Sequence, residues 1–169
     1  MTQHGPIAPS AWVLRWAPLV THGTVLDVAC GSGRHANFFL GKGLNVVALD
    51  REAQSIPGAR FIQANLEDGS PWPVPGEQCE AVVVTNYLNR EIFPAIQESL
   101  KAGGVLIYET FMLGNERFGK PSNPSFLLRP GELLECFKGL SVKGFEEGEV
   151  ADPKPAMIQR LCAVRAGKG

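Results

Sequence analysis

A carboxylate followed by a glycine-rich turn is the first feature of this sequence that could do chemistry. In the stretch from Val25 to Ala36, Asp27 lies near the end of an apolar, β-branched run, and Gly31 and Gly33 follow it. Glycines at such a turn let a ligand approach the backbone, because no side chain intervenes. The N–H groups at the start of the helix expected after the turn favour electron-rich ligand atoms. Asp27 itself suits a cationic group, such as an α-amino group, better than a pyrophosphate.

A second acid, Asp50, ends the next apolar run, which begins at Asn45. Strand, turn, helix and strand in this order form a β-α-β unit. An acid that ends its second strand is placed to bind both hydroxyls of a ribose. The glycine turn and Asp50 therefore predict a site for an adenosine-containing cofactor in the first third of the chain. A structural turn without a ligand accounts for the glycines but not for both acids.

Two classes of cofactor fit these residues. The segment from Gly31 to Ala36 satisfies the relaxed dinucleotide pattern G-x-G-x-x-G/A, so a nicotinamide-binding module is one alternative. Asp27 and the end of the chain argue against it. The last two β-rich runs, 140–150 and 156–166, have no helix between them, and neighbouring strands without a crossover pair antiparallel. A dehydrogenase of this length would also have no room for a substrate domain.

The pattern Asp27-x-x-Cys30-Gly31-x-Gly33 followed by Asp50 resembles the first two motifs of class I S-adenosylmethionine-dependent methyltransferases. Two later stretches, YETF at 108–111 and NERFGKPSNPSFLLRPGELL at 115–134, resemble a bacterial branch related to the tellurite-resistance methyltransferases. The resemblance extends from about Trp12 to Val164. It implies an α/β, Rossmann-like three-layer sandwich whose seven-stranded, mostly parallel sheet has an antiparallel last strand. It also implies S-adenosyl-L-methionine as the cofactor.

The elements that position this site can be predicted from pattern. Ser10 is expected to cap a helix over 10–20 that places Trp12, Trp16 and Leu19 on one side. Further strands are expected at 60–65, 80–88 and 104–111.

Helices are expected over 89–101, kinked at Pro94 and ended by residues 102–104, and again from Pro130. The polar segment 112–129 is too long for a mere connection and is expected to form a loop over the methyl acceptor. A solvated surface loop is the alternative.

Ligands of open α/β sheets bind at the carboxyl edge of the strands, where the cofactor site is expected. Asp50 would bind the ribose, and the resemblance places Asn65 near the adenine, at a position where an acid is usual. Ordinary turn chemistry is the alternative for Asn65. The cofactor-binding residues expected at this edge are Asp27, Cys30, Gly31, Gly33, Asp50, Arg51, Asn65, Leu66, Thr85 and Asn86.

Three residues are candidates for the transfer step. Tyr87 can offer its ring face to the sulfonium, although a core-edge aromatic is an equal alternative. Glu109 is the candidate general base, provided that the acceptor needs deprotonation. Arg117, together with Lys120, suggests an anionic acceptor, whereas the tellurite-like resemblance suggests a soft nucleophile.

Composition narrows the class of protein. The chain has 169 residues, which fits one domain, 1–169, with a proper core. Its net charge is −1 and it has no run of Lys or Arg, which disfavours a nucleic-acid partner. Four cysteines without a C-x-x-C pair and three histidines offer no metal-ligand spacing, and isolated thiols suit the cytoplasm. No signal peptide and no membrane-spanning run is recognised.

These observations predict a cytoplasmic methyltransferase that transfers the methyl group of S-adenosylmethionine to a small-molecule acceptor. A non-catalytic S-adenosylmethionine-binding sensor, with side chains filling the acceptor pocket, is one alternative. An NAD-binding Rossmann module is the less favoured one. Neither a nucleic acid nor a membrane is expected as a partner, and no oligomeric state follows from the residues.

Overall fold

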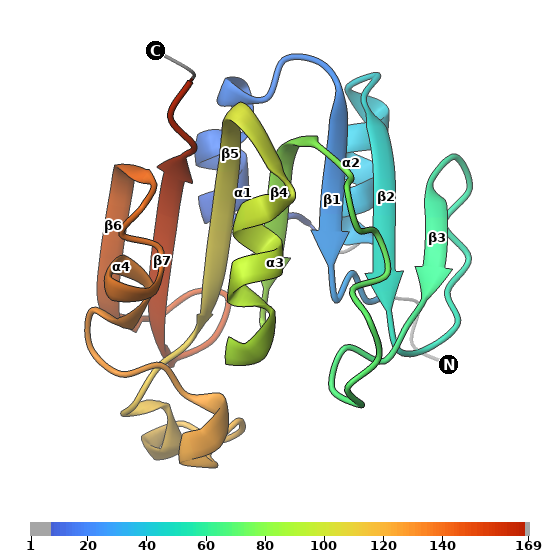
Figure 1. Ribbon diagram of the computed structural model, residues 1–169. Helices are drawn as coiled ribbons and strands as arrows, with labels where there is room; N and C mark the ends of the chain where they lie inside the picture. Colours follow the sequence, from blue (N-terminus) through green and yellow to red (C-terminus); the bar gives the residue numbers. More distant parts are fainter. Residues whose placement is uncertain (1–7, 168–169) are drawn as a thin grey trace.

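The computed structural model describes residues 8–167 and is built on one seven-stranded sheet (Figure 1). The strand order is β3-β2-β1-β4-β5-β7-β6. Strands β1 to β5 pair in parallel, and β7 inserts antiparallel between β5 and β6. The predicted fold class is therefore confirmed, including the reversed last strand. The strands are β1 Thr24–Val28, β2 Asn45–Asp50, β3 Arg60–Gln63, β4 Cys79–Thr85, β5 Leu100–Phe111, β6 Ser141–Val150 and β7 Ala156–Val164.

Helices cover both faces of the sheet and make three layers. Helices α1 (Ala11–Trp16) and α2 (Arg34–Gly41) lie behind the sheet in Figure 1, and α3 (Phe93–Glu98) and α4 (Glu132–Cys136) lie in front. Central strand β4 is buried along its whole length. Its side chains alternate between two apolar clusters, one packed on each helical layer. Such a strand, buried on both faces, explains the continuous apolar run in its sequence.

The N-terminal helix begins as predicted. The Ser10 hydroxyl accepts a hydrogen bond from the Val13 N–H at 3.1 Å, which caps the first turn. Trp12 packs into the core behind the sheet and meets Trp16 edge to face, with ring centroids 5.6 Å apart. The prediction for Leu19 is wrong, since its side chain is exposed. The α-helix ends at Trp16, and a 3₁₀ turn containing Pro18 rotates Leu19 away from the tryptophans.

The helix expected over 89–101 is shorter than predicted. A 3₁₀ turn over Arg90–Ile92 precedes α3, which spans only Phe93–Glu98. Pro94 lies in the first turn of α3 and does not kink it, because its missing N–H has no partner to lose there. The residues expected to end the helix belong to β5, which starts at Leu100. Gly103 N–H donates to the Arg165 carbonyl and Arg165 N–H to the Gly104 carbonyl.

Another strand boundary differs from expectation. Strand β3 ends at Gln63, before Asn65. The segment 112–129 forms the predicted loop, which lies below the end of β5 at the lower left of Figure 1 and contains 3₁₀ turns over Asn115–Arg117 and Pro124–Phe126. Its ends pair with each other through a bridge between Met112 and Leu128. Among residues 8–167, no helix has both the length and the hydropathy that crossing a membrane requires.

Candidate cofactor and acceptor site

The turn after β1 bends sharply toward β2. Ala29, Gly31 and Gly33 all have positive φ, at 57°, 56° and 95°. Cys30 lies within the turn, where its N–H donates to the Leu49 carbonyl of β2 at 2.8 Å. Glycine adopts this left-handed conformation without strain, but Ala29 carries a Cβ and is disfavoured there by about 1–2 kcal/mol. Helix α2 follows the turn directly and begins at Arg34.

The two glycines of the turn serve different purposes. A Cβ on Gly31 would meet nothing within 4 Å, so the space above this residue is open. A Cβ on Gly33 would lie 2.9 Å from the Cδ1 atom of Ile56. The space at Gly31 is therefore open, as a ligand at this turn would need, whereas a side chain on Gly33 would collide with Ile56.

Asp50 holds the turn in place. Its Oδ2 accepts a hydrogen bond from the Gly31 N–H at 2.8 Å, and its Oδ1 accepts one from the Glu52 N–H at 2.9 Å. Each carboxylate oxygen has a second lone pair, so ribose hydroxyls can still bind. Asp50 thus has a structural role beyond the one predicted from its position. The next residue, Arg51, is exposed, and its carbonyl accepts from the Gln63 side chain.

Asp27 is a buried acid with an unsatisfied oxygen. Only 2% of its surface is exposed, and Oδ2 finds no hydrogen-bond partner anywhere in residues 8–167. Burial raises the pKa of Asp27 to about 7, although a backbone hydrogen bond from Ala36 and the charge of Arg34 oppose the shift. An ionised, buried carboxylate with one oxygen left unsatisfied is costly unless a cation binds it. This is the arrangement expected for an acid that holds a ligand ammonium group.

Cys30 contributes its backbone and not a reactive thiol. Burial, reinforced by the charges of Asp27 and Asp50, raises the pKa of the Cys30 thiol to about 12. The thiol therefore stays protonated at neutral pH and is a poor nucleophile.

The residues predicted around the adenine lie at the same edge of the sheet. The Asn65 Oδ1 accepts a hydrogen bond from the Glu67 N–H at 2.9 Å, which is the turn interaction weighed as the alternative. The Leu66 carbonyl accepts from the Asn89 side chain at 2.9 Å, which joins the end of β3 to the end of β4. The Tyr87 carbonyl accepts from the Tyr108 hydroxyl at 2.8 Å. Burial, with the nearby charge of Glu67, raises the pKa of Tyr87 to about 12, so its phenol is neutral.

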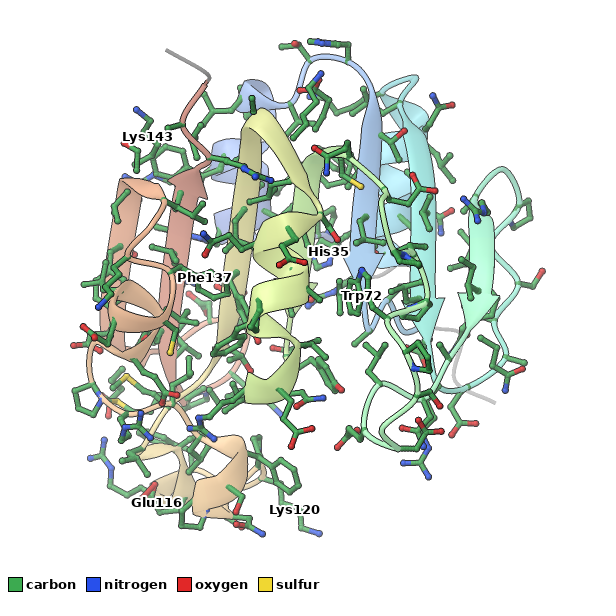
Figure 2. All side chains as sticks on the ribbon, viewed as in Figure 1. His35, Trp72, Glu116, Lys120, Phe137 and Lys143 are labelled. Atoms are coloured by element: carbon green, nitrogen blue, oxygen red, sulfur yellow. The ribbon has the colours of Figure 1, made fainter. Side chains whose placement is uncertain are left out.

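Thr85 and Asn86 end β4 beside a residue that sequence reasoning missed. His35, labelled in Figure 2, lies in the first turn of α2 and is buried. Its Nε2 accepts from the Ser10 N–H at 3.0 Å, and its Nδ1 lies 3.4 Å from the Thr85 hydroxyl. Burial, with the charge of Arg34, lowers the pKa of His35 to about 4, so the ring is neutral. Asn86 has a φ of 55°, and its N–H donates to the Glu109 carbonyl.

Glu109 is not the free carboxylate that the sequence suggested. Its Oε2 forms a buried ion pair with the Arg160 guanidinium of β7, its register partner. Arg160 also pairs with Glu146 at 3.3 Å, and Glu146 pairs with the exposed Arg15 at 3.0 Å. The ion pair thus occupies one oxygen of the carboxylate that was the candidate general base. No local sequence signal marks Arg160 as the partner, since it lies 51 residues away.

Arg117 and Lys120 are not brought together into an anion site. The Arg117 Nε donates to the Gly114 carbonyl of its own loop at 3.1 Å, and its Nη2 lies 3.8 Å from Glu149 at the end of β6. Its guanidinium also stacks over the Phe118 ring. Lys120 lies at the outer tip of the loop in Figure 2. The structure thus gathers Asp27, Gly31, Asp50 and Thr85 at one edge and leaves Arg117 over β6 and β7.

Comparisons with known proteins agree with this geometry. The family model described as Tellurite resistance protein TehB matches residues 8–68, a segment that includes the glycine turn, Asp50 and Asn65. The match does not reach the later stretches 108–111 and 115–134. A search of curated protein sequences found no significant match.

Solved structures show the same fold over nearly the whole chain. TehB from Haemophilus influenzae is 20% identical, with a TM-score of 0.71 over 90% of this chain, which spans 61% of the length of that protein. A methyltransferase from Methanosarcina mazei is 13% identical, with a TM-score of 0.69, and covers 96% of this chain and 100% of its own. The 1,6-didemethyltoxoflavin-N1-methyltransferase of Burkholderia thailandensis, with S-adenosylhomocysteine bound, is 16% identical, with a TM-score of 0.66 over 92% of this chain and 76% of its own.

The family-model match and the shared fold confirm the resemblance predicted from the sequence. Residues 8–68 are similar to the family model of the tellurite resistance protein TehB, and the chain as a whole has the fold of the S-adenosylmethionine-dependent methyltransferases.

Proposed function

We propose that the protein is a methyltransferase that uses S-adenosylmethionine and acts on a small-molecule acceptor. Two observations carry the proposal: the buried Asp27 oxygen that has no hydrogen-bond partner, and the open space at Gly31, four residues later in the chain. A pyrophosphate would place more negative charge against this acid, whereas an ammonium group would satisfy it. The proposal therefore favours a cofactor with an amino-acid end over a nicotinamide dinucleotide.

The residues present fit this cofactor. Asp27 would hold its ammonium group, and the backbone at Gly31 would lie against it. Asp50, with lone pairs remaining beside its two hydrogen bonds, would take the ribose hydroxyls. Asn65 and Leu66 would lie near the adenine, with Thr85 and Asn86 near the sulfonium.

The bound cofactor supplies a methyl group already activated by the positive sulfur. The chain has to align the acceptor with that carbon and exclude water. Tyr87 follows the end of β4 and is half-buried, so its ring can lie against the cation. Because Glu109 is held by Arg160, we do not assign a protein base, and this favours an acceptor that reacts without deprotonation, such as a soft nucleophile.

The loop 112–129 is proposed to cover the acceptor, since it follows β5 at the same edge. We propose that Arg117 contributes to acceptor binding by fixing the loop through its hydrogen bond to the Gly114 carbonyl, and not as a free cation. We also infer a single domain located in the cytoplasm. The cysteines among the described residues are all unpaired, as is usual in a reducing compartment.

Two measurements test the proposal. Calorimetric titration with S-adenosylhomocysteine should show binding, and NAD should bind more weakly or not at all. Incubation with methyl-labelled S-adenosylmethionine and pools of small molecules should transfer label to an acceptor. Tighter binding of NAD would overturn the cofactor assignment. Binding without transfer to any pool would point to a cofactor sensor instead.

A further inference from the structure

Arg90 joins the end of β4 to the loop 112–129. It opens the 3₁₀ turn that directly follows the segment Thr85–Asn89 at the cofactor edge. The Asn89 side chain caps this turn through Glu91 N–H and reaches across to the Leu66 carbonyl. The backbone position of Arg90 is therefore fixed from the cofactor side.

The guanidinium of Arg90 forms its hydrogen bonds with the second half of the loop 112–129 and with helix α4, which follows the loop. Its Nε and Nη2 bind the two oxygens of Glu132 at 2.5 and 3.0 Å, and Nη2 and Nη1 donate to the carbonyls of Leu127 at 2.9 Å and Ser125 at 3.1 Å. A paired, planar donor set of this kind fixes orientation as well as distance.

Glu132 is an unusual acid for a helix start, because its side chain is only 1% exposed. Its Oε1 also accepts from the Arg129 N–H at 2.8 Å. Burial alone would raise the pKa of Glu132, but the hydrogen bonds from Arg90 and Arg129 outweigh burial and lower it. The first half of the loop is held differently: Asn115 binds the Met157 N–H of β7 and the Pro121 carbonyl.

We propose that Arg90 is a positioning residue for methyl transfer, which couples the Thr85–Tyr87 segment to residues 123–129 of the acceptor loop. The inference rests on the proposed function, because it takes the segment before Arg90 as the cofactor side and the loop bound by its guanidinium as the acceptor side. Cofactor binding at the β4 edge then restrains the loop through the Arg90–Glu132 pair, and the acceptor pocket keeps its place relative to the sulfonium.

Amide hydrogen exchange with and without S-adenosylhomocysteine tests the coupling without a known acceptor. In the wild type, S-adenosylhomocysteine should slow exchange over 123–129 by about tenfold. Arg90→Lys keeps the charge but loses the paired geometry, so it should abolish this slowing while the affinity for S-adenosylhomocysteine stays within about threefold. Arg60→Lys is the matched control, because Arg60 pairs with Glu77 in an exposed position on β3.

Glu132→Gln supplies a second variant in case Arg90→Lys does not fold, and it too should weaken the slowing. A merely structural anchor would speed loop exchange equally in both states and leave the cofactor-dependent difference intact. An intact cofactor-dependent difference in Arg90→Lys would overturn the inference and leave the proposed function standing. The same holds if S-adenosylhomocysteine binds the wild type without slowing exchange over 123–129. Absence of S-adenosylhomocysteine binding overturns the proposed function and the inference with it.

Discussion

Replacing Asp27 with asparagine should stabilise the ligand-free protein and weaken its cofactor binding. The side chain keeps its shape and loses its charge. In the folded protein the pKa of Asp27 is raised from 3.8 to about 7, chiefly by burial. The folded state thus holds the proton more tightly than the unfolded chain, and ionisation opposes folding. This cost of ionisation to the free energy of unfolding is absent below about pH 4, grows between about pH 4 and pH 7, and is constant above that.

The size of the effect follows from the shift. Each pKa unit corresponds to about 1.4 kcal/mol, so a shift of about three units makes the fully ionised carboxylate cost on the order of 4 kcal/mol. The free energy of unfolding of Asp27→Asn minus that of the wild type should therefore grow by roughly 2–3 kcal/mol between pH 5 and pH 8. His35 also titrates below neutral pH, but it is present in both proteins and cancels from the difference.

Urea unfolding of the ligand-free proteins at several pH values measures this difference. Asp152→Asn, an exposed change of the same chemistry, should shift stability by less than about 0.5 kcal/mol at every pH. Titration at pH 8 should show that Asp27→Asn binds S-adenosylhomocysteine about 10–100-fold more weakly, the loss of one charged hydrogen bond. A stability difference that does not change with pH would refute the buried, unpaired carboxylate. Unchanged affinity would refute its role toward the ammonium group.

Three further changes test other parts of the site. Asp50→Ala should destabilise the fold by about 1–3 kcal/mol, because the N–H groups of Gly31 and Glu52 lose their acceptor. It should also weaken S-adenosylhomocysteine binding. Unchanged thermal unfolding would contradict the role of Asp50 in holding the turn. Ala29→Gly should raise the free energy of unfolding by about 1 kcal/mol, because glycine removes the strain of a φ of 57°; a loss in chemical denaturation would count against that strain. Arg117→Ala should slow labelled methyl transfer while S-adenosylhomocysteine affinity, measured calorimetrically, stays within about threefold; an unaltered rate would remove Arg117 from the acceptor loop's function.

Much of the fold was predictable because local pattern determines it. Apolar β-branched runs predicted the strands, and the helix-free link between 150 and 156 predicted the antiparallel last pair. Gly31 predicted an open turn because a position with positive φ and ligand space selects glycine. Ser10 predicted a helix start because its hydroxyl satisfies an N–H within three residues. Each of these signals lies within a few residues of the feature it specifies.

The tertiary structure alone decided which side chains meet. Glu109 pairs with Arg160 because β7 inserts beside β5 in one register, and no local pattern specifies that register. Arg90 meets Glu132, 42 residues later, because α3 and α4 cover the same face of the sheet. His35 is one of three histidines whose spacing predicted no role, yet the fold places its ring beside the Thr85 hydroxyl. The sequence by itself determined the glycine turn, the positions of Asp27 and Asp50 at the ends of their strands, and the class of fold. Each of these depends on neighbours along the chain. Burial and long-range pairing decided that Asp27 is left unpaired and Glu109 is not, because both depend on how distant strands pack.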